Sequence, residues 1–216
     1  VEVRDGKNVY RQRFKRGNPE NELQKGEETN ETGTTVTFRS DEEIFTDTTH
    51  YSYDTLLTRL REQAFLNAGV KIVLTDTRED EEKRTDVLHY EGGIRSYCEF
   101  LLEKSRKEAL HDDIVYIEGK NTDDMAEIAF QYNNGYDTKI VSFANDIHTV
   151  DGGTHEQAFK TALTRVLNNY ARKFKILKEN DANLKGEDVQ EGIIAIISVK
   201  LKNAQFEGQT KAKLGN

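Results

Sequence analysis

The stretch IIAIISVKL, residues 193 to 201, contains the longest apolar run of the chain, which only Ser198 interrupts. This run is far shorter than the ~18 residues that a membrane-spanning helix needs. Its isoleucines and valine favour a buried strand. The stretch therefore predicts a rigid strand in a protein core, and no segment is predicted to span a membrane.

The predicted strand ends shortly before the last residues of the chain, QFEGQTKAKLGN at 205 to 216. This tail is polar, and the buried strand would hold it at a short, fixed distance from the protein core. A lysine such as Lys211 can meet a terminal phosphate as a point charge, and the neighbouring Gln209 can donate to another oxygen. The residues alone leave two interpretations open, a phosphate-binding loop and an ordinary exposed loop.

The composition indicates a globular chain with a strongly charged surface. Hydrophobic residues make up 35% and charged residues 32% of the 216 residues, which allows a sizeable core. The length exceeds the usual single domain of about 100 to 150 residues, so we expect two units, with a boundary at Gly92 and Gly93. The formal net charge of −8 disfavours non-specific adhesion to nucleic acid, which depends on cations.

The sulfur-containing residues bear on location and completeness. Cys98 is the single cysteine and shares a helical face with Ile94, Tyr97 and Leu101, so we expect a buried thiol. One cysteine excludes an internal disulfide and a cysteine-based zinc finger, which agrees with the cytoplasm. The only methionine is Met125 and the sequence starts inside a running pattern, so we expect a fragment of a longer protein.

Hydrophobic periodicity and turn residues predict the order of the elements. The first half reads as a hairpin (1–14), a surface loop (17–33), a strand (34–38), a helix (55–68) and strands at 71–77 and 85–90. The second half reads as a helix around Cys98, strands at 113–119, 126–132 and 139–145, a long helix and the strand at 193–201. Asp54 is expected to cap the first helix, and the charged run 77–86 to form a solvated turn.

The segment VDGGTHEQ, residues 150 to 157, precedes the long helix. Thr154 and Gln157 are expected to form a capping box at its start. Two glycines before a helix can leave free N–H groups for an anion, and they can equally form a tight strand-to-helix turn. Both interpretations stay open at this point.

Several kinds of chemistry lack their sequence signals. The five histidines are scattered without an HxxxH pair, and neither a GxSxG nor a Walker A motif occurs, so no metal site is predicted. Cations gather toward the end of the long helix, which suits either a helix C-terminus or a DNA-contacting patch. They are Arg165, Arg172, Lys173, Lys175 and Lys178.

Strings along nearly the whole chain resemble one family. They are RDGK, TGTTV, RLREQAFLNAGVKI, HYEGGI, DGGTHEQAFKTALTRVLNNYARK, GEDVQEG, AIISVK and QFEGQTKAKLGN. In this order they resemble the B-type ATPase subunits of bacterial type IIA topoisomerases, which include those of DNA gyrase and topoisomerase IV. The strings do not separate gyrase from topoisomerase IV.

The resemblance implies an α+β fold with two domains. Residues 1–92 would be the C-terminal half of a GHKL ATPase domain, an α/β sandwich. Residues 93–216 would be a transducer domain similar to the second domain of ribosomal protein S5, with a left-handed βαβ crossover, which is an exception to the usual hand. The transducer would end in the QTK loop.

The resemblance also implies roles for individual residues. Gln209 and Lys211 would contact the γ-phosphate of ATP. Thr34 and Val36 would line the adenine pocket, although Val36 could simply belong to the core. Arg4 would lie at the pocket mouth, where coumarin antibiotics bind.

Further along the chain, Lys160 and Arg172 would face DNA, with plain exposed helix residues as the simpler alternative. ATP and Mg²⁺ would be the cofactors of the full subunit. The general-base glutamate and the Mg²⁺-binding asparagine of the family would lie upstream of Val1. The fragment alone is therefore expected not to hydrolyse ATP.

At the level of the whole protein, the resemblance implies a cytoplasmic, ATP-hydrolysing DNA topoisomerase subunit. It would couple ATP binding and hydrolysis to closure of a dimer gate and passage of double-stranded DNA, in supercoiling or decatenation. Its partners would be DNA, the A-type DNA-cleaving subunit in a heterotetramer of two A and two B subunits, and a second ATPase region on ATP binding. The alternative is a stand-alone S5-like module that binds RNA or protein and has no nucleotide role.

Overall fold

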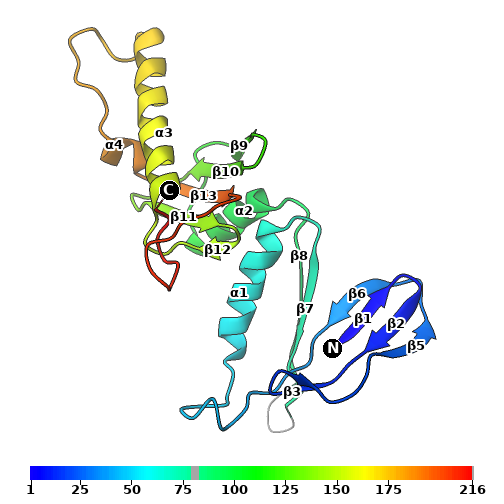
Figure 1. The fold of residues 1–216 in the computed structure, drawn as a ribbon. Coiled ribbons are helices and arrows are strands. Elements are labelled where there is room, and N and C mark those ends of the chain that lie inside the picture. The colour runs from blue at the N-terminus through cyan, green and yellow to red at the C-terminus, as the bar shows by residue number, and fades with distance from the viewer. Residues whose placement is uncertain (79–82, 216) are drawn as a thin grey trace. The chain divides into compact units, whose positions relative to one another are not determined.

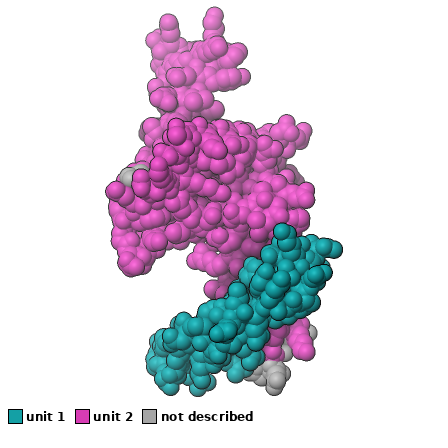
Figure 2. Space-filling model, turned by 45° about the vertical axis from the view of Figure 1, so that its right-hand side comes forward, with its two compact units in different colours: residues 1–52 teal, residues 53–216 magenta. Residues whose placement is uncertain are grey.

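The computed structural model describes residues 1–78 and 83–215 (Figure 1). Its backbone contacts divide the chain into two compact units, Val1–Ser52 and Tyr53–Asn216 (Figure 2). Within the described residues, no helix is long and apolar enough to cross a membrane.

The unit Val1–Ser52 contains a four-stranded antiparallel sheet of order β5-β2-β1-β6. Its strands are β1 (Glu2–Asp5), β2 (Asn8–Arg11), β5 (Gln24–Glu28) and β6 (Thr32–Thr35), and a separate pair is β3 (Phe14–Lys15) with β4 (Asn18–Pro19). The predicted N-terminal hairpin is confirmed, since β1 pairs with β2. At its turn, Asp5 Oδ1 accepts the N–H groups of Lys7 and Asn8, each at 2.8 Å.

Two expectations for this unit were wrong. The segment expected to be a surface loop, 17–33, contains strand β5. All residues of β5 are exposed, and the strand is held to β2 by backbone hydrogen bonds, so its sequence shows no pattern of apolar residues. The strand expected at 34–38 begins earlier and ends at Thr35. Val36 follows it with 59% of its surface exposed, so it is not a core residue.

The second unit begins with a helix and a strand pair, as predicted. These are α1 (Tyr53–Leu66), β7 (Lys71–Thr75) and β8 (Thr85–His89). Helix α1 begins one residue before Asp54, so Asp54 lies in the first turn, where its carboxylate is 3.1 Å from the Arg84 guanidinium. Of the charged run expected to form a solvated turn, residues 79–82 lie outside the described residues.

The remaining elements build a five-stranded sheet of order β12-β11-β13-β10-β9. Its strands are β9 (Val115–Lys120), β10 (Met125–Tyr132), β11 (Lys139–Ala144), β12 (Ile147–His148) and β13 (Ile193–Lys200). The helices are α2 (Ile94–Ser105), α3 (Thr154–Lys173) and the short α4 (Gly186–Gln190). No sequence pattern had predicted α4.

Strand β13 is the centre of this sheet, and the prediction of a buried strand is confirmed. Ile194 and Ile196 pack in one cluster with Cys98 of α2, whereas Ile193 and Ile197 pack in another with Phe159 of α3. Because successive side chains point to opposite faces, a strand covered on both faces must be apolar at nearly every position.

The α2 layer also receives the end of α1. Phe65 of α1 stacks on Tyr97 of α2 with ring centroids 4.6 Å apart, which explains why α1 joins the second unit although it precedes Gly92 and Gly93. Cys98 is fully buried as predicted, its thiol lies 3.7 Å from the carbonyl oxygen of Ile194, and burial raises its pKa to about 12.

Strands β11 and β13 are parallel neighbours, and the chain between them runs through β12, α3 and α4. This is a βαβ connection of the kind that the resemblance implies. Its left-handedness stays a prediction.

Candidate functional site

The terminal residues form a narrow loop that folds back on itself. Phe206 and Leu214 pair as an antiparallel bridge, and the Glu207 N–H donates to the Lys213 carbonyl at 2.9 Å. At the tip, the Lys211 N–H donates to the Gly208 carbonyl at 3.3 Å, and Gly208 has a φ of 91°. Residues 208–211 are all exposed, so the loop presents the side chains that the sequence singled out.

The far end of this loop is fixed to the turn before α3. Leu214 is 1% exposed and pairs as a parallel bridge with Gly153. Its N–H donates to the Gly152 carbonyl and its carbonyl accepts the Thr154 N–H, each at 3.1 Å. A Cβ atom on Gly153 would lie 2.4 Å from the Leu214 carbonyl oxygen, so only glycine lets the two backbones approach.

These contacts correct one expectation about residues 150–157 and bear on the two interpretations that the sequence left open. The capping box of Thr154 and Gln157 is absent, because Thr154 is already the first helical residue and Gly153 occupies the cap position without a side-chain hydrogen bond. Two of the N–H groups considered for an anion are in use, since the Thr154 N–H donates to the Leu214 carbonyl and the Gly152 N–H to the Thr149 carbonyl. These two bonds favour the tight-turn interpretation of this segment.

The cation at the tip has no competing carboxylate partner among the described residues. Lys211 Nζ lies 5.8 Å from the centroid of the Phe206 ring, whereas Lys213 Nζ pairs with Glu207 at 3.1 Å. No hydrogen bond to the side chain of Gln209 occurs among the residues that the structure describes. The tip therefore offers one ammonium group and one amide to solvent.

A buried polar network lies beneath the turn. Ser142 Oγ donates to Glu156 Oε2 at 2.9 Å and lies 2.8 Å from Thr149 Oγ1, which in turn lies 3.1 Å from His155 Nε2. His155 Nδ1 is buried and has no partner among the described residues. Because Thr149 Oγ1 donates to the Ser142 carbonyl, it is free to accept a hydrogen bond from His155 Nε2, which assigns a proton to that nitrogen.

The two predicted DNA-facing residues both have partners within the chain. Lys160 Nζ lies 2.7 Å from Glu156 Oε1. Arg172 donates to the Asp181 carbonyl at 2.6 Å and to Asn183 Oδ1 at 2.8 Å, and also to the carbonyls of Lys178 and Glu179. Arg172 therefore holds the connection that follows α3.

The remaining predicted site residues lie in the first unit. Arg4 is held by Glu31 and by the Thr35 hydroxyl, each at 3.0 Å. Thr34 pairs with Val3 on the neighbouring strand, so the alternation of side chains places Thr34 on the opposite sheet face from Arg4. Thr34 and Val36 are both exposed.

The comparisons with known proteins give the family. The sequence model of DNA gyrase B matches residues 93–216, more than half of the chain. The chain belongs to the DNA gyrase B family.

Individual gyrase B relatives agree with this membership. The chain is 53% identical to the gyrase B protein of Bacillus mycoides over 213 residues, 99% of this chain and 52% of that protein. It is 52% identical to the gyrase B protein of Staphylococcus aureus (strain MRSA252) over 216 residues, 100% of this chain and 33% of that protein. The chain thus spans between a third and about half the length of these two relatives.

A solved gyrase structure has the same fold. The 43K ATPase domain of Thermus thermophilus gyrase B, solved in complex with an aminocoumarin, matches with a TM-score of 0.81 and 38% identity. The match covers 100% of this chain and 57% of that one.

Sequence reasoning missed the two residues that anchor the loop, Leu214 and Gly153. Leu214 is the only large apolar residue after Phe206, which is the signal that could have marked it as an anchor. Gly153 was noted only as part of a glycine pair, because nothing in the sequence tells that a distant backbone approaches it.

A substitution at Gly153 tests whether its contact with Leu214 holds the loop. Gly153→Ala places a methyl group against the Leu214 backbone and should detach the loop, so the amides of Leu214 and Thr154 should exchange with solvent about 10-fold faster or more. Gly119→Ala is the matched control, since nothing lies within 4 Å of its added Cβ. Unchanged exchange in Gly153→Ala would show that the contact between Gly153 and Leu214 does not hold the loop.

The buried imidazole predicts a pH dependence. Burial lowers the pKa of His155 below its ordinary value of 6.5, an effect that Glu156 partly opposes. As the pH falls below 6.5, the unfolded chain takes up this proton before the folded chain does, so the free energy of unfolding should decrease. His148, whose pKa burial also lowers, should act in the same direction.

Urea unfolding at pH 7.5 and 5.5 measures this loss of stability. His155→Gln should reduce the difference between the two pH values, whereas the exposed His89→Gln should leave it as in the wild type. An equal difference in all three proteins would contradict a neutral, buried His155.

Proposed function

We propose that this chain is the nucleotide-sensing and force-transmitting part of a DNA gyrase B protein. Lys211 and Gln209 contact the γ-phosphate of ATP, and the strand behind them passes the resulting movement on. The observation that carries the proposal is the exposed tip cation on a loop whose far end is fixed through Leu214. Family membership makes a nucleotide phosphate the relevant anion for that cation.

The chemistry of the tip follows from its charges. ATP supplies a γ-phosphoryl group whose negative charge spreads over its oxygens during transfer, and Mg²⁺ neutralises part of that charge. Lys211 adds a point charge against these oxygens, while the amide of Gln209 donates a directional hydrogen bond. Because the loop is already folded, little conformational freedom remains to be lost when its tip engages.

The sensing step depends on which group the tip loses. After hydrolysis and phosphate release, Lys211 has no γ-phosphate partner, so the free energy that held the tip in place disappears. The loop follows β13 after a short connection, so release at the tip allows β13 and its sheet to shift. The general-base glutamate and the Mg²⁺ ligands belong, in this proposal, to a part of the full protein upstream of Val1, and the fragment alone does not turn over ATP.

The first unit contributes to the adenine side of the nucleotide site. We assign Thr34 and Val36 to the adenine pocket, which agrees with their exposure, since core residues would be unavailable to a ligand. We place Arg4 at the pocket mouth, where Glu31, just before the neighbouring strand β6, and Thr35, at the end of that strand, hold its guanidinium. In the domain division that goes with these roles, residues 1–92 complete the ATPase domain and 93–216 form the transducer.

The wider assembly is proposed from the family. The full-length protein acts in the cytoplasm with the A-type DNA-cleaving subunit, and ATP binding pairs two ATPase regions around a segment of double-stranded DNA. Lys160 is our candidate for a DNA contact, which requires it to leave Glu156. Arg172 is a weaker candidate, because its donors already hold residues 178–183.

The direct test is ATP turnover by the full-length protein with its A-type partner and DNA, at saturating ATP. Lys211→Ala removes a preorganised cation and should lower turnover by about 10² to 10³. Lys213→Ala is the matched control, since that lysine lies in the same loop but pairs with Glu207, and it should stay near the wild-type rate. Wild-type turnover in Lys211→Ala, with the fold intact, would show that the loop has no role in sensing the nucleotide.

A further inference from the structure

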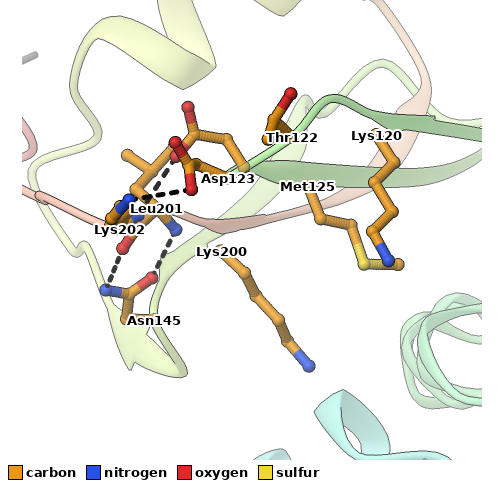
Figure 3. Close-up of a pocket in the computed structure, with 9 residues that line it drawn as sticks. Lys120, Thr122, Asp123, Met125, Asn145, Lys200, Leu201 and Lys202 are labelled. Atoms are coloured by element: carbon orange, nitrogen blue, oxygen red, sulfur yellow. Dashed lines mark hydrogen bonds and ion pairs between the residues drawn. The ribbon is translucent and has the colours of Figure 1, made fainter.

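The terminal segment leaves the sheet at Leu201, directly after β13. There the side chain of Asn145 forms hydrogen bonds with the backbone of Leu201 (Figure 3). Asn145 Nδ2 donates to the Leu201 carbonyl at 2.9 Å, and Asn145 Oδ1 accepts the Leu201 N–H at 2.7 Å. The Asn145 N–H also donates to the Val199 carbonyl at 2.9 Å. One side chain thus satisfies both polar backbone groups of the residue at which the strand ends.

The turn between β9 and β10 holds the next residue, Lys202, by two contacts. The Lys202 N–H donates to Asp124 Oδ1 at 3.1 Å, and Lys202 Nζ lies 2.9 Å from Asp123 Oδ1. Both aspartates belong to the β9–β10 turn, which Asn121 shapes by accepting their N–H groups. The two turns and the exit of β13 border a surface pocket of about 380 Å³, which Figure 3 shows in close-up.

The turn that carries Asn145 also contacts helix α1. Asn145 and Asp146 join β11 to β12 with φ values of 50° and 62°, the left-handed pair of a two-residue hairpin turn. On the side of α1, Gln63 Nε2 donates to the Asp146 carbonyl at 2.9 Å. Beside it, Glu62 lies 3.7 Å and Arg59 3.4 Å from Nδ1 of His148.

Asn145 therefore lies between two parts of the chain that the proposed function needs to connect. Helix α1 belongs to the sequence stretch that we assign to the ATPase domain, and Leu201 begins the segment that ends in the sensing loop. A shift of α1 would move the Asp146 carbonyl, and the two side-chain bonds of Asn145 would carry that shift to Leu201. Because the two bonds hold both polar backbone groups of Leu201, a displacement of Asn145 would displace Leu201 with it.

We propose that Asn145 is a positioning residue, which fixes where the terminal segment leaves the sheet and makes that exit point depend on helix α1. The inference rests on the proposed function, because the position of Lys211 matters for turnover only if Lys211 contacts the γ-phosphate. With Gly153 at the far end, the segment 201–215 has two fixed points, and the exposed tip lies between them. The position of the tip is then set by the sheet and by α1 together.

The test variant is Asn145→Gly, measured in the full-length protein. Glycine accepts the left-handed conformation of the turn, so the variant removes the two side-chain bonds and keeps the backbone. Amides of residues 201–207 should exchange about 10-fold faster or more. With the A-type partner and DNA, kcat for ATP should fall by about 10-fold or more while KM changes little, because a misplaced tip weakens contacts made during the reaction.

Asp146→Gly is the matched control in the same turn. It keeps the carbonyl that binds Gln63, and Asp146 Oδ1 is buried without a partner among the described residues, so its loss removes no contact to Leu201. Exchange and kcat should stay near those of the wild type. If Asn145→Gly unfolds, Asn145→Asp serves instead, since it keeps the acceptor for the Leu201 N–H and places a carboxylate against the Leu201 carbonyl.

The possible outcomes separate this inference from the proposed function. Exchange at 201–207 that is equal in Asn145→Gly and Asp146→Gly would overturn the positioning role, whatever Lys211→Ala does. Faster exchange with an unchanged kcat would also overturn it, because the exit point would then not set the tip. An unchanged turnover in Lys211→Ala would instead overturn the sensing function, and the exchange data would still decide whether Asn145 holds Leu201.

Discussion

The close approach of the Leu214 and Gly153 backbones is the constraint on which the presentation of the terminal tip depends. Leu214 is buried and bonded on both of its backbone groups to the turn before α3, at a distance that excludes a side chain on Gly153. Without this bridge, residues 205–215 would lose their main attachment to the turn before α3, and ordering them on a ligand would cost more conformational entropy. With it, only the tip has freedom left to lose.

The sheet explains how two distant parts of the chain reach that bridge. Strand β13 is covered by α2 on one face and by α3 on the other, so its direction is fixed by packing on both sides. Strand β11 runs parallel beside it and leads through β12 to the turn that holds Leu214. The polar network under that turn, with a neutral His155, ties the start of α3 to β11 through Ser142.

How much of this the sequence could predict depends on the range of the interactions. Strand β13 and helices α1, α2 and α3 were predictable, because burial leaves a local pattern of apolar residues, as at Ile194 and Ile196. Strand β5 was not, since its exposed residues pair only through the backbone. Gln209 and Lys211 could be proposed as phosphate contacts because the QTK string is local, and this role stays a prediction. The bonds of Asn145 to Leu201 could not, because they join residues 56 positions apart and depend on tertiary structure.

The central claim is that a preformed loop meets the γ-phosphate with its tip. Hydrogen exchange at residues 208–211 of the full-length protein, with Mg²⁺ and either a non-hydrolysable ATP analogue or ADP, tests it most directly. The account predicts slower exchange at the tip with the analogue but not with ADP, while the amides of Leu214 and Thr154 exchange slowly in every state. Equal protection of the tip by both nucleotides, or by neither, would contradict it.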